Sequence, residues 1–229
     1  MKIIPDCKHD LRSMTFHCRL AAVLLLAMLS AHSAHGDIIV DTGEPVGSNG
    51  FYLGLYQDQI TFQWLAGEFT LTQDWLITDV EGFIQDHLLN NSGSLSAFIY
   101  SNGSNNLPGT ILYSESFTVN DTGGFPIDHW YGVHGVNWNL TAGNYWVAFE
   151  THDGQTYGGG MPYQPPHPLA NYAIQNSSTG GYLPLGNDAG LGVRISAVPT
   201  PIPGAWFLLM SGMIGLYFQK RRHSHKTEH

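Results

Sequence analysis

The sequence predicts an all-β domain, an antiparallel two-sheet sandwich with a jelly-roll-like arrangement of its strands. Short runs rich in aromatic and β-branched residues recur along the middle of the chain, separated by turn-forming Gly, Asn, Ser and Thr. Apolar residues at helical spacing are scarce in this part. No repeat and no linker divides it, so residues 37–198 are predicted to form one domain.

The strands are expected to follow one another at roughly regular spacing. Their expected ranges are Phe51–Gln57, Gln59–Leu65, Glu68–Thr72, Trp75–Gln85, Ser94–Tyr100, Ile111–Val119, Trp130–Asn139, Asn144–Thr151, Asn171–Gln175 and Leu191–Ala197. Alternation is clearest in two of them. In the first strand, one face carries Leu95, Ala97 and Ile99. In the second strand, one face carries Tyr145, Val147 and Phe149, and the opposite face carries Trp146, Ala148 and Glu150.

The cysteines and the charges are distributed unevenly. Cys7 and Cys18 both precede the predicted domain, which therefore relies on its core without disulfides. Of the 9 Lys and Arg in the chain, only Arg194 lies in residues 37–198. Three of the 18 Asp and Glu lie outside these residues, which leaves 15 acids against one Arg and a net charge of about −14 for the predicted domain. Such a surface repels nucleic acid and anionic lipid headgroups, so no nucleic-acid partner is expected. It suits solubility outside the cell, or binding of divalent cations.

The N-terminal segment has the pattern of a secretory signal peptide. An apolar run, Leu20–Leu29, follows Arg19 and precedes a stretch of small residues. Ala34 and Gly36 suit the minus-three and minus-one positions, so residues 1–36 are expected to be removed. Met14 is an alternative start that gives a signal of more ordinary length.

The C-terminal segment combines a hinge, an apolar helix and a basic stop. Prolines at 199, 201 and 203 hold the hinge extended. Residues 204–218 carry no charge and are predicted to form a short transmembrane helix. The cluster at 220–222 should stay cytoplasmic under the positive-inside rule, together with the tail 223–229.

This segment, residues 199–222, resembles the PEP-CTERM sorting signal of exported bacterial proteins. The residues that carry the resemblance are Val198, Pro199, Thr200, Pro201, Lys220, Arg221 and Arg222. The resemblance implies an exosortase-type processing enzyme as partner and a Gram-negative-type host that makes exopolysaccharide. Thr200 stands where the family has Glu, so membrane anchoring without cleavage remains the alternative.

Two stretches of the domain resemble extracellular β-sandwiches of anchored bacterial proteins. One is a strand, Leu-Pro-Gly turn, strand unit at 97–113, and the other is the Leu-Thr-Ala-Gly-Asn-Tyr-Trp sequence at 140–146. The resemblance implies a β-sandwich fold and transfers no catalytic residue.

Motifs for catalysis or metal binding are absent from the sequence. His129 and His134 are five positions apart, which places them on opposite faces of a strand, so no shared metal is expected. His152-Asp153-Gly154 predicts a turn at the end of a strand. No cofactor is expected, although a structural calcium between two loops remains open because acids and other oxygen ligands are plentiful.

Acidic and aromatic side chains supply the remaining candidates. Carboxylates that would suit a glycosidase pair are Glu68, Asp74, Asp79 and Glu81. Exposed aromatic rings stack on sugars, and residues 158–168 have no strand pattern. Tyr157, Tyr163 and His167 therefore lack an obvious core to enter and are the predicted glycan-binding residues.

Together these features predict an exported protein of the cell envelope or extracellular matrix. Its ectodomain would lie outside the cytoplasm, anchored in the inner membrane or released to the cell surface. The leading hypothesis is a non-enzymatic structural or adhesive role. The alternatives are a carbohydrate-binding module for exopolysaccharide and a polysaccharide hydrolase.

Overall fold

The computed structural model describes residues 36–46, 50–56, 58, 60–90, 93–120, 128–186, 190–200 and 212; for residues 86–90 and 128 it describes the backbone alone. Twelve β-strands account for most of the described residues. They are β1 (Asp37–Asp41), β2 (Gly50–Leu55), β3 (Phe62–Leu71), β4 (Trp75–Asn90), β5 (Gly93–Asn102), β6 (Pro108–Val119), β7 (Asp128–Leu140), β8 (Gly143–Glu150), β9 (Gly158–Pro162), β10 (Tyr172–Asn176), β11 (Leu183–Leu185) and β12 (Val193–Pro199).

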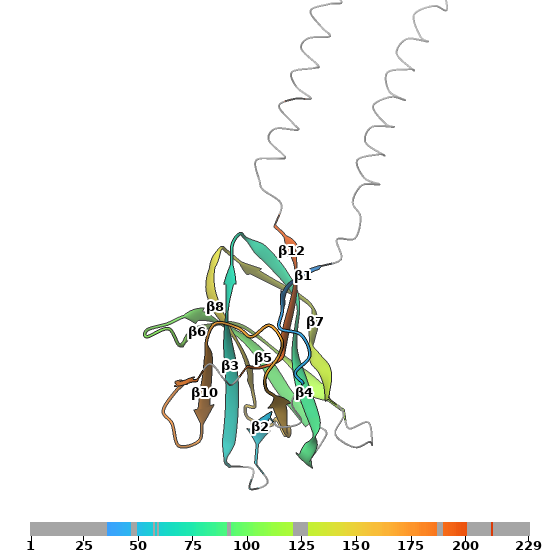
Figure 1. The fold of residues 1–229 in the computed structure, drawn as a ribbon, viewed down its shortest axis with the longest axis vertical. Helices are drawn as coiled ribbons and strands as arrows, with labels where there is room; N and C mark the ends of the chain where they lie inside the picture. Colours follow the sequence, from blue (N-terminus) through green and yellow to red (C-terminus); the bar gives the residue numbers. More distant parts are fainter. Residues whose placement is uncertain are drawn as a thin grey trace, which may run out of the picture. The chain divides into compact units, whose positions relative to one another are not determined.

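All strand pairs are antiparallel, and the hydrogen-bonded order runs β1-β12-β4-β9-β2-β3-β8-β5-β6. Strand β7 adds to β4, and β10 pairs with both β3 and β11. In Figure 1, β10, β3 and β8 lie on the left of the domain, while β12, β4 and β7 lie on the right. The predicted all-β, antiparallel fold is confirmed. The strands form one hydrogen-bonded sheet rather than two, because β9 and β2 join the two halves.

The two halves of this sheet pack against each other through an apolar core. A side chain at Gly82 of β4 would meet the Phe149 ring of β8, whose Cζ lies 2.8 Å from the position of a Cβ. Between β6 and β7, the rings of Tyr113 and Trp138 stack with centroids 5.5 Å apart. The shared faces predicted from alternation are confirmed, and both of them point into the core. All six residues lie in the main core cluster: Leu95, Ala97, Ile99, Tyr145, Val147 and Phe149.

Four expectations about strands were wrong. Residues 62–71 form one strand where two were expected, because Ala66 and Gly67 pair with Ala148 and Val147 and continue the ladder. Strand β4 runs on to Asn90, five residues beyond its expected end. Strands β1 and β11 were not expected. Strand β9 was expected to be part of a loop.

Strand β9 was not predicted because its sequence, Gly-Gly-Gly-Met-Pro, lacks the β-branched and aromatic side chains that are typical of a strand. All five residues are buried, and the strand pairs with β2 and β4. A side chain at Gly158 would overlap the carbonyl oxygen of Leu55, and one at Gly159 would overlap the Tyr157 hydroxyl. Glycine is therefore required because neighbouring groups approach this backbone closely.

Most of both predicted targeting segments lies outside the described residues. Gly36 of the signal peptide belongs to the described part, as do Pro199, Thr200 and Gly212 of the segment 199–222. Within that part, no helix is long and apolar enough to cross a membrane.

Candidate functional site

A groove with a volume of about 680 Å³ opens beside the N-terminal end of β3. We call it the Trp64 groove. It is lined by Leu55, Ile60, Phe62, Trp64 and residues 151–156. Ile60 stands at its rim with 79% of its surface exposed. The groove therefore brings apolar side chains from the β2–β3 connection together with polar groups from the turn after β8.

Aromatic rings form one wall of the groove. Phe62 and Trp64 on β3 stack with ring centroids 4.4 Å apart. The His152 ring continues the row, with its centroid 4.6 Å from that of Trp64 and 5.0 Å from that of Phe98. Phe62 and Trp64 are only half-buried, so part of each residue is exposed to solvent.

The turn after β8 is held by its own hydrogen bonds. The backbone N–H of Gln155 donates to the His152 carbonyl at 2.9 Å, and the Gln155 side-chain oxygen accepts from the His152 N–H at 2.9 Å. Gly154 has a φ of 81°, which favours glycine. The predicted turn at 152–154 is thus confirmed.

Side-chain contacts fasten the same turn to the sheet. The Gln155 amide donates to the hydroxyl of Ser96 on β5 at 2.6 Å and to that of Ser116 on β6 at 3.1 Å. The Trp64 indole N–H points to the Thr151 hydroxyl at 3.4 Å. The groove wall is therefore pre-organised by contacts to three strands.

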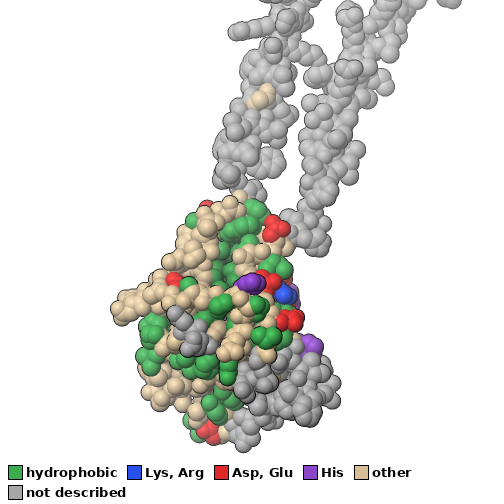
Figure 2. Space-filling view, viewed as in Figure 1, with side chains coloured by type: hydrophobic (Ala, Val, Ile, Leu, Met, Phe, Trp, Pro, Cys, Tyr) green, Lys and Arg blue, Asp and Glu red, His purple; other side chains and the backbone are tan. Residues whose placement is uncertain are grey.

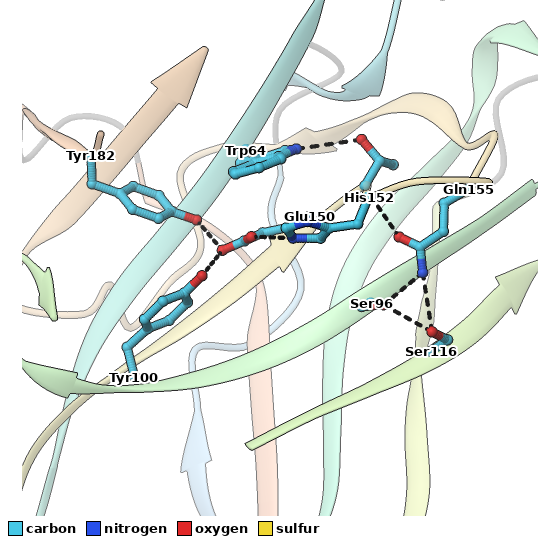
Figure 3. A network of polar contacts seen from close by, with 9 residues as sticks. Trp64, Ser96, Tyr100, Ser116, Glu150, His152, Gln155 and Tyr182 are labelled. Carbon is cyan, nitrogen blue, oxygen red and sulfur yellow. Dashed lines mark hydrogen bonds and ion pairs between the residues drawn. The ribbon is translucent and has the colours of Figure 1, made fainter. Parts of the chain in front are cut away.

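A buried carboxylate lies behind this wall (Figure 3). Glu150, the last residue of β8, has no exposed surface. Its Oε1 accepts hydrogen bonds from the hydroxyls of Tyr100 at 2.6 Å and Tyr182 at 2.7 Å, and its Oε2 lies 2.7 Å from Nε2 of His152. Burial raises the pKa of both tyrosines, and the adjacent Glu150 charge raises it further. The phenols therefore remain protonated donors to the carboxylate.

A second polar network lies on the same face of the sheet, away from the groove. Glu68 of β3 is buried and accepts from the side-chain amides of Asn106 at 2.9 Å and Asn171 at 2.5 Å. The side-chain amide of Asn102 donates to the side-chain oxygen of Asn106 at 2.7 Å, and the Asn102 side-chain oxygen accepts from the Trp146 indole N–H at 3.0 Å. This network ties two loops to β3 and β8, which is a structural role.

The three residues predicted to bind glycan are not brought together. Tyr157 is fully buried; its hydroxyl donates to the Gln85 carbonyl at 2.7 Å and accepts from the Gly160 N–H. Tyr163 is half-buried, with its ring 5.9 Å from that of Phe51. His167 is exposed, and its backbone N–H donates to the Thr42 carbonyl. The expectation that Tyr157 has no core to enter was wrong, because the residue is fully buried in the main core cluster and its hydroxyl is hydrogen-bonded to β4 and β9.

The start of the predicted sorting signal belongs to the folded sheet. Val198 and Pro199 end β12 and pair with Leu76 and Trp75 of β4. The Thr200 hydroxyl donates to the Asp74 carbonyl at 3.1 Å. Pro201 and the basic residues Lys220, Arg221 and Arg222 lie outside the described residues.

The other candidate acids and histidines lie apart from the groove. On β7, His129 lies opposite Ile84 and His134 opposite Asp79, on opposite faces as alternation predicts. Nδ1 of His134 lies 3.3 Å from Oδ1 of Asp79, and its Nε2 lies 3.9 Å from Oε1 of Glu81. In the part of the chain that the structure describes, no group of three His, Cys, Asp or Glu is placed to hold a metal ion. The structural calcium stays a prediction.

Sequence reasoning missed most of the Trp64 groove. One available clue was the alternation of β8, which places Glu150 on the same face as the apolar Trp146 and Ala148. A carboxylate on an otherwise apolar face needs hydrogen-bond donors from elsewhere in the fold. Its tyrosine donors lie 50 and 32 residues away in the chain, which the pattern alone does not reveal.

No protein-family model matches the chain, and no curated protein matches it in sequence.

Proposed function

We propose that this chain is an exported, non-enzymatic adhesive protein of the cell envelope or extracellular matrix, and that its β domain binds neutral polysaccharide in the Trp64 groove. The observation that carries the proposal is the half-exposed stack of Phe62 and Trp64 along the groove. Aromatic faces pack against the C–H faces of sugar rings, and nearby polar groups bind hydroxyls. His152 and Asp153 supply such groups at this groove.

Export and sorting are proposed on the sequence pattern. We propose residues 1–36 as a signal peptide, residues 37–198 as a jelly-roll-like ectodomain and residues 199–222 as a PEP-CTERM-like signal with its membrane helix at 204–218. An exosortase-type enzyme and exopolysaccharide are the proposed partners. Alkaline phosphatase fused after residue 198 should be active and fused after residue 229 should be inactive. Activity at both positions would contradict the proposed topology.

The geometry of the acids favours binding over hydrolysis. A glycosidase needs two carboxylates on either side of the bond that it cleaves. Asp153 lines the Trp64 groove, whereas the nearby Glu150 is buried and already accepts three hydrogen bonds. The predicted glycosidase candidates Glu68 and Asp79 are hydrogen-bonded elsewhere on the sheet.

Binding is tested with full-length protein in detergent on an array of neutral and acidic oligosaccharides. We expect neutral sugars to bind, and we expect Trp64→Ala to weaken binding by about tenfold or more, because large aromatic side chains dominate such contacts. Tyr163→Ala removes a half-buried aromatic ring outside the groove and is the matched control. Equal binding by the wild type and Trp64→Ala would overturn the groove assignment.

A loss confined to Tyr163→Ala would instead favour the glycan-binding residues predicted from the sequence. Hydrolysis is a separate outcome, read as new reducing ends after incubation with the oligosaccharides that bind. Their release by the wild type would overturn the non-enzymatic proposal.

A further inference from the structure

The burial of Glu150 requires an explanation, because the side chain has no exposed surface and two of its three partners come from distant parts of the chain. A buried carboxylate is costly unless its oxygens are hydrogen-bonded or its charge is paired. Tyr100 and Tyr182 supply neutral donors. Of the three partners, only His152 can carry a positive charge at neutral pH. The carboxylate is therefore coupled to a residue of the groove wall.

His152 connects this carboxylate to the groove. Its side chain is 43% exposed, and it lines the groove beside Trp64 (Figure 3). Because Glu150 is an acceptor, it favours a proton on Nε2 in both the neutral and the charged imidazole. Nδ1 is then the ring nitrogen left for a ligand. Neutral His152 offers an acceptor there, and protonated His152 offers a charged donor.

We infer that Glu150 is a positioning residue of the sugar-binding groove, which fixes the ring and the tautomer of His152 so that its Nδ1 binds a sugar hydroxyl. This inference rests on the function proposed above. Losing this hydrogen bond should weaken the binding of a neutral sugar by about fivefold.

The buried acid of the second network provides a matched control. Glu68, like Glu150, is buried on this face of the sheet and accepts hydrogen bonds from two side chains. It does not line the groove. Glu68→Gln tests the general effect of neutralising a buried carboxylate, whereas Glu150→Gln tests the link to His152.

The experiment uses full-length protein in detergent with cellohexaose, xylohexaose and chitohexaose as probes. Dissociation constants are measured at one fixed pH, and long-range ¹H–¹⁵N NMR reports the His152 tautomer. We expect the wild type to hold the Nε2–H tautomer. In Glu150→Gln the tautomer preference should be lost and the affinity should fall by about fivefold, whereas Glu68→Gln should behave as wild type.

A second variant covers the case in which Glu150→Gln does not fold. His152→Asn leaves Glu150 with both tyrosine hydroxyls and should weaken binding to a similar extent. Unchanged affinity in either variant, or equal effects of Glu150→Gln and Glu68→Gln, overturns the inference. If Trp64→Ala abolishes binding while these variants match the wild type, the proposed function stands and the inference alone fails. Absence of binding to all three sugars overturns both.

Discussion

The guanidinium of Arg194 lies over the indole ring of Trp130, with Cζ 4.1 Å from the ring centroid. Arg194 is on β12 and Trp130 is on β7, so the contact reaches across β4, which pairs with both. Arg194 also lies 3.6 Å from Asp41 of β1. It is the only Lys or Arg among the described residues. Figure 2 shows one blue side chain among red and purple ones at the right edge of the domain.

We predict that the ring contact, more than the ion pair, makes Arg194 stabilising. Arg194→Ala should lower the free energy of unfolding by about 1–2 kcal/mol, measured by urea denaturation, because a partly desolvated cation–π contact and its packing are lost. The Asp41 side chain is 40% exposed, so Asp41→Asn should cost less than about 1 kcal/mol. Equal losses in the two variants would assign the effect to the ion pair instead.

Strand β9 gives a prediction on packing. A Cβ at Gly159 would lie 2.6 Å from the Gln85 carbonyl oxygen and would overlap the Tyr157 hydroxyl, neither of which can move freely in the core. Gly159→Ala should therefore destabilise the domain by about 2–3 kcal/mol, read from thermal or urea unfolding. Gly180→Ala, where nothing lies within 4 Å, is the control and should change stability by less than about 0.5 kcal/mol. Similar stability in both variants would contradict the close approach.

Alternation in the sequence predicted correctly which residues of β5 and β8 share a face, because successive side chains of a strand point to opposite sides of the sheet. The opposite face of both strands is buried as well. Leu95, Ala97 and Val147 have no exposed surface. The same reasoning failed for β9, where glycine is required by contacts from β2 and β4 that no local pattern reports. A strand without side chains carries no alternation to read.

The candidate site was less predictable for a similar reason. Trp64 could be singled out as an aromatic residue, but its position at a groove depends on the turn after β8. Tyr157 was expected to have no core to enter, because strand β9 beside it was not expected. Burial of Glu150 depends on Tyr182, which comes from the connection between β10 and β11. Long-range partners of this kind are set by the fold, not by spacing in the chain.

The tyrosines that bind Glu150 predict a loss of stability in alkaline solution. Burial and the Glu150 carboxylate raise the pKa of Tyr100 and of Tyr182 in the folded state. An unfolded tyrosine titrates near pH 10. Below that pH both states keep the proton and the contribution is fully present. Above it the unfolded chain releases protons that the folded chain retains, so stability falls as pH rises.

Urea unfolding at intervals from pH 8 to pH 11.5 measures this slope. Tyr182→Phe should be less stable than wild type at pH 8 by about 1–3 kcal/mol, because Glu150 loses a donor. Its stability should then fall less steeply above pH 10, because one phenol no longer titrates. A slope equal to that of the wild type would contradict the coupling of Tyr182 to Glu150.

The end of β12 predicts where a processing enzyme would cut, if the C-terminal signal is read. Val198 and Pro199 pair with Leu76 and Trp75, and Thr200 is hydrogen-bonded to the Asp74 carbonyl. A protease needs an extended, unpaired segment, so cleavage before Thr200 would first require the end of β12 to separate from β4. Mature protein from the matrix should therefore end at residues 200–203, as measured by mass spectrometry of its C-terminal peptide.

Variants of the same segment separate sorting from simple anchoring. Thr200→Glu restores the residue of the family that the signal resembles and should raise the processed fraction. Replacing Arg221 and Arg222 with Glu should weaken both the membrane stop and the orientation, because positive residues favour the cytoplasmic side. An intact C-terminus on all protein recovered from the matrix, in the wild type and in Thr200→Glu alike, would show that the segment is an anchor and not a cleaved signal.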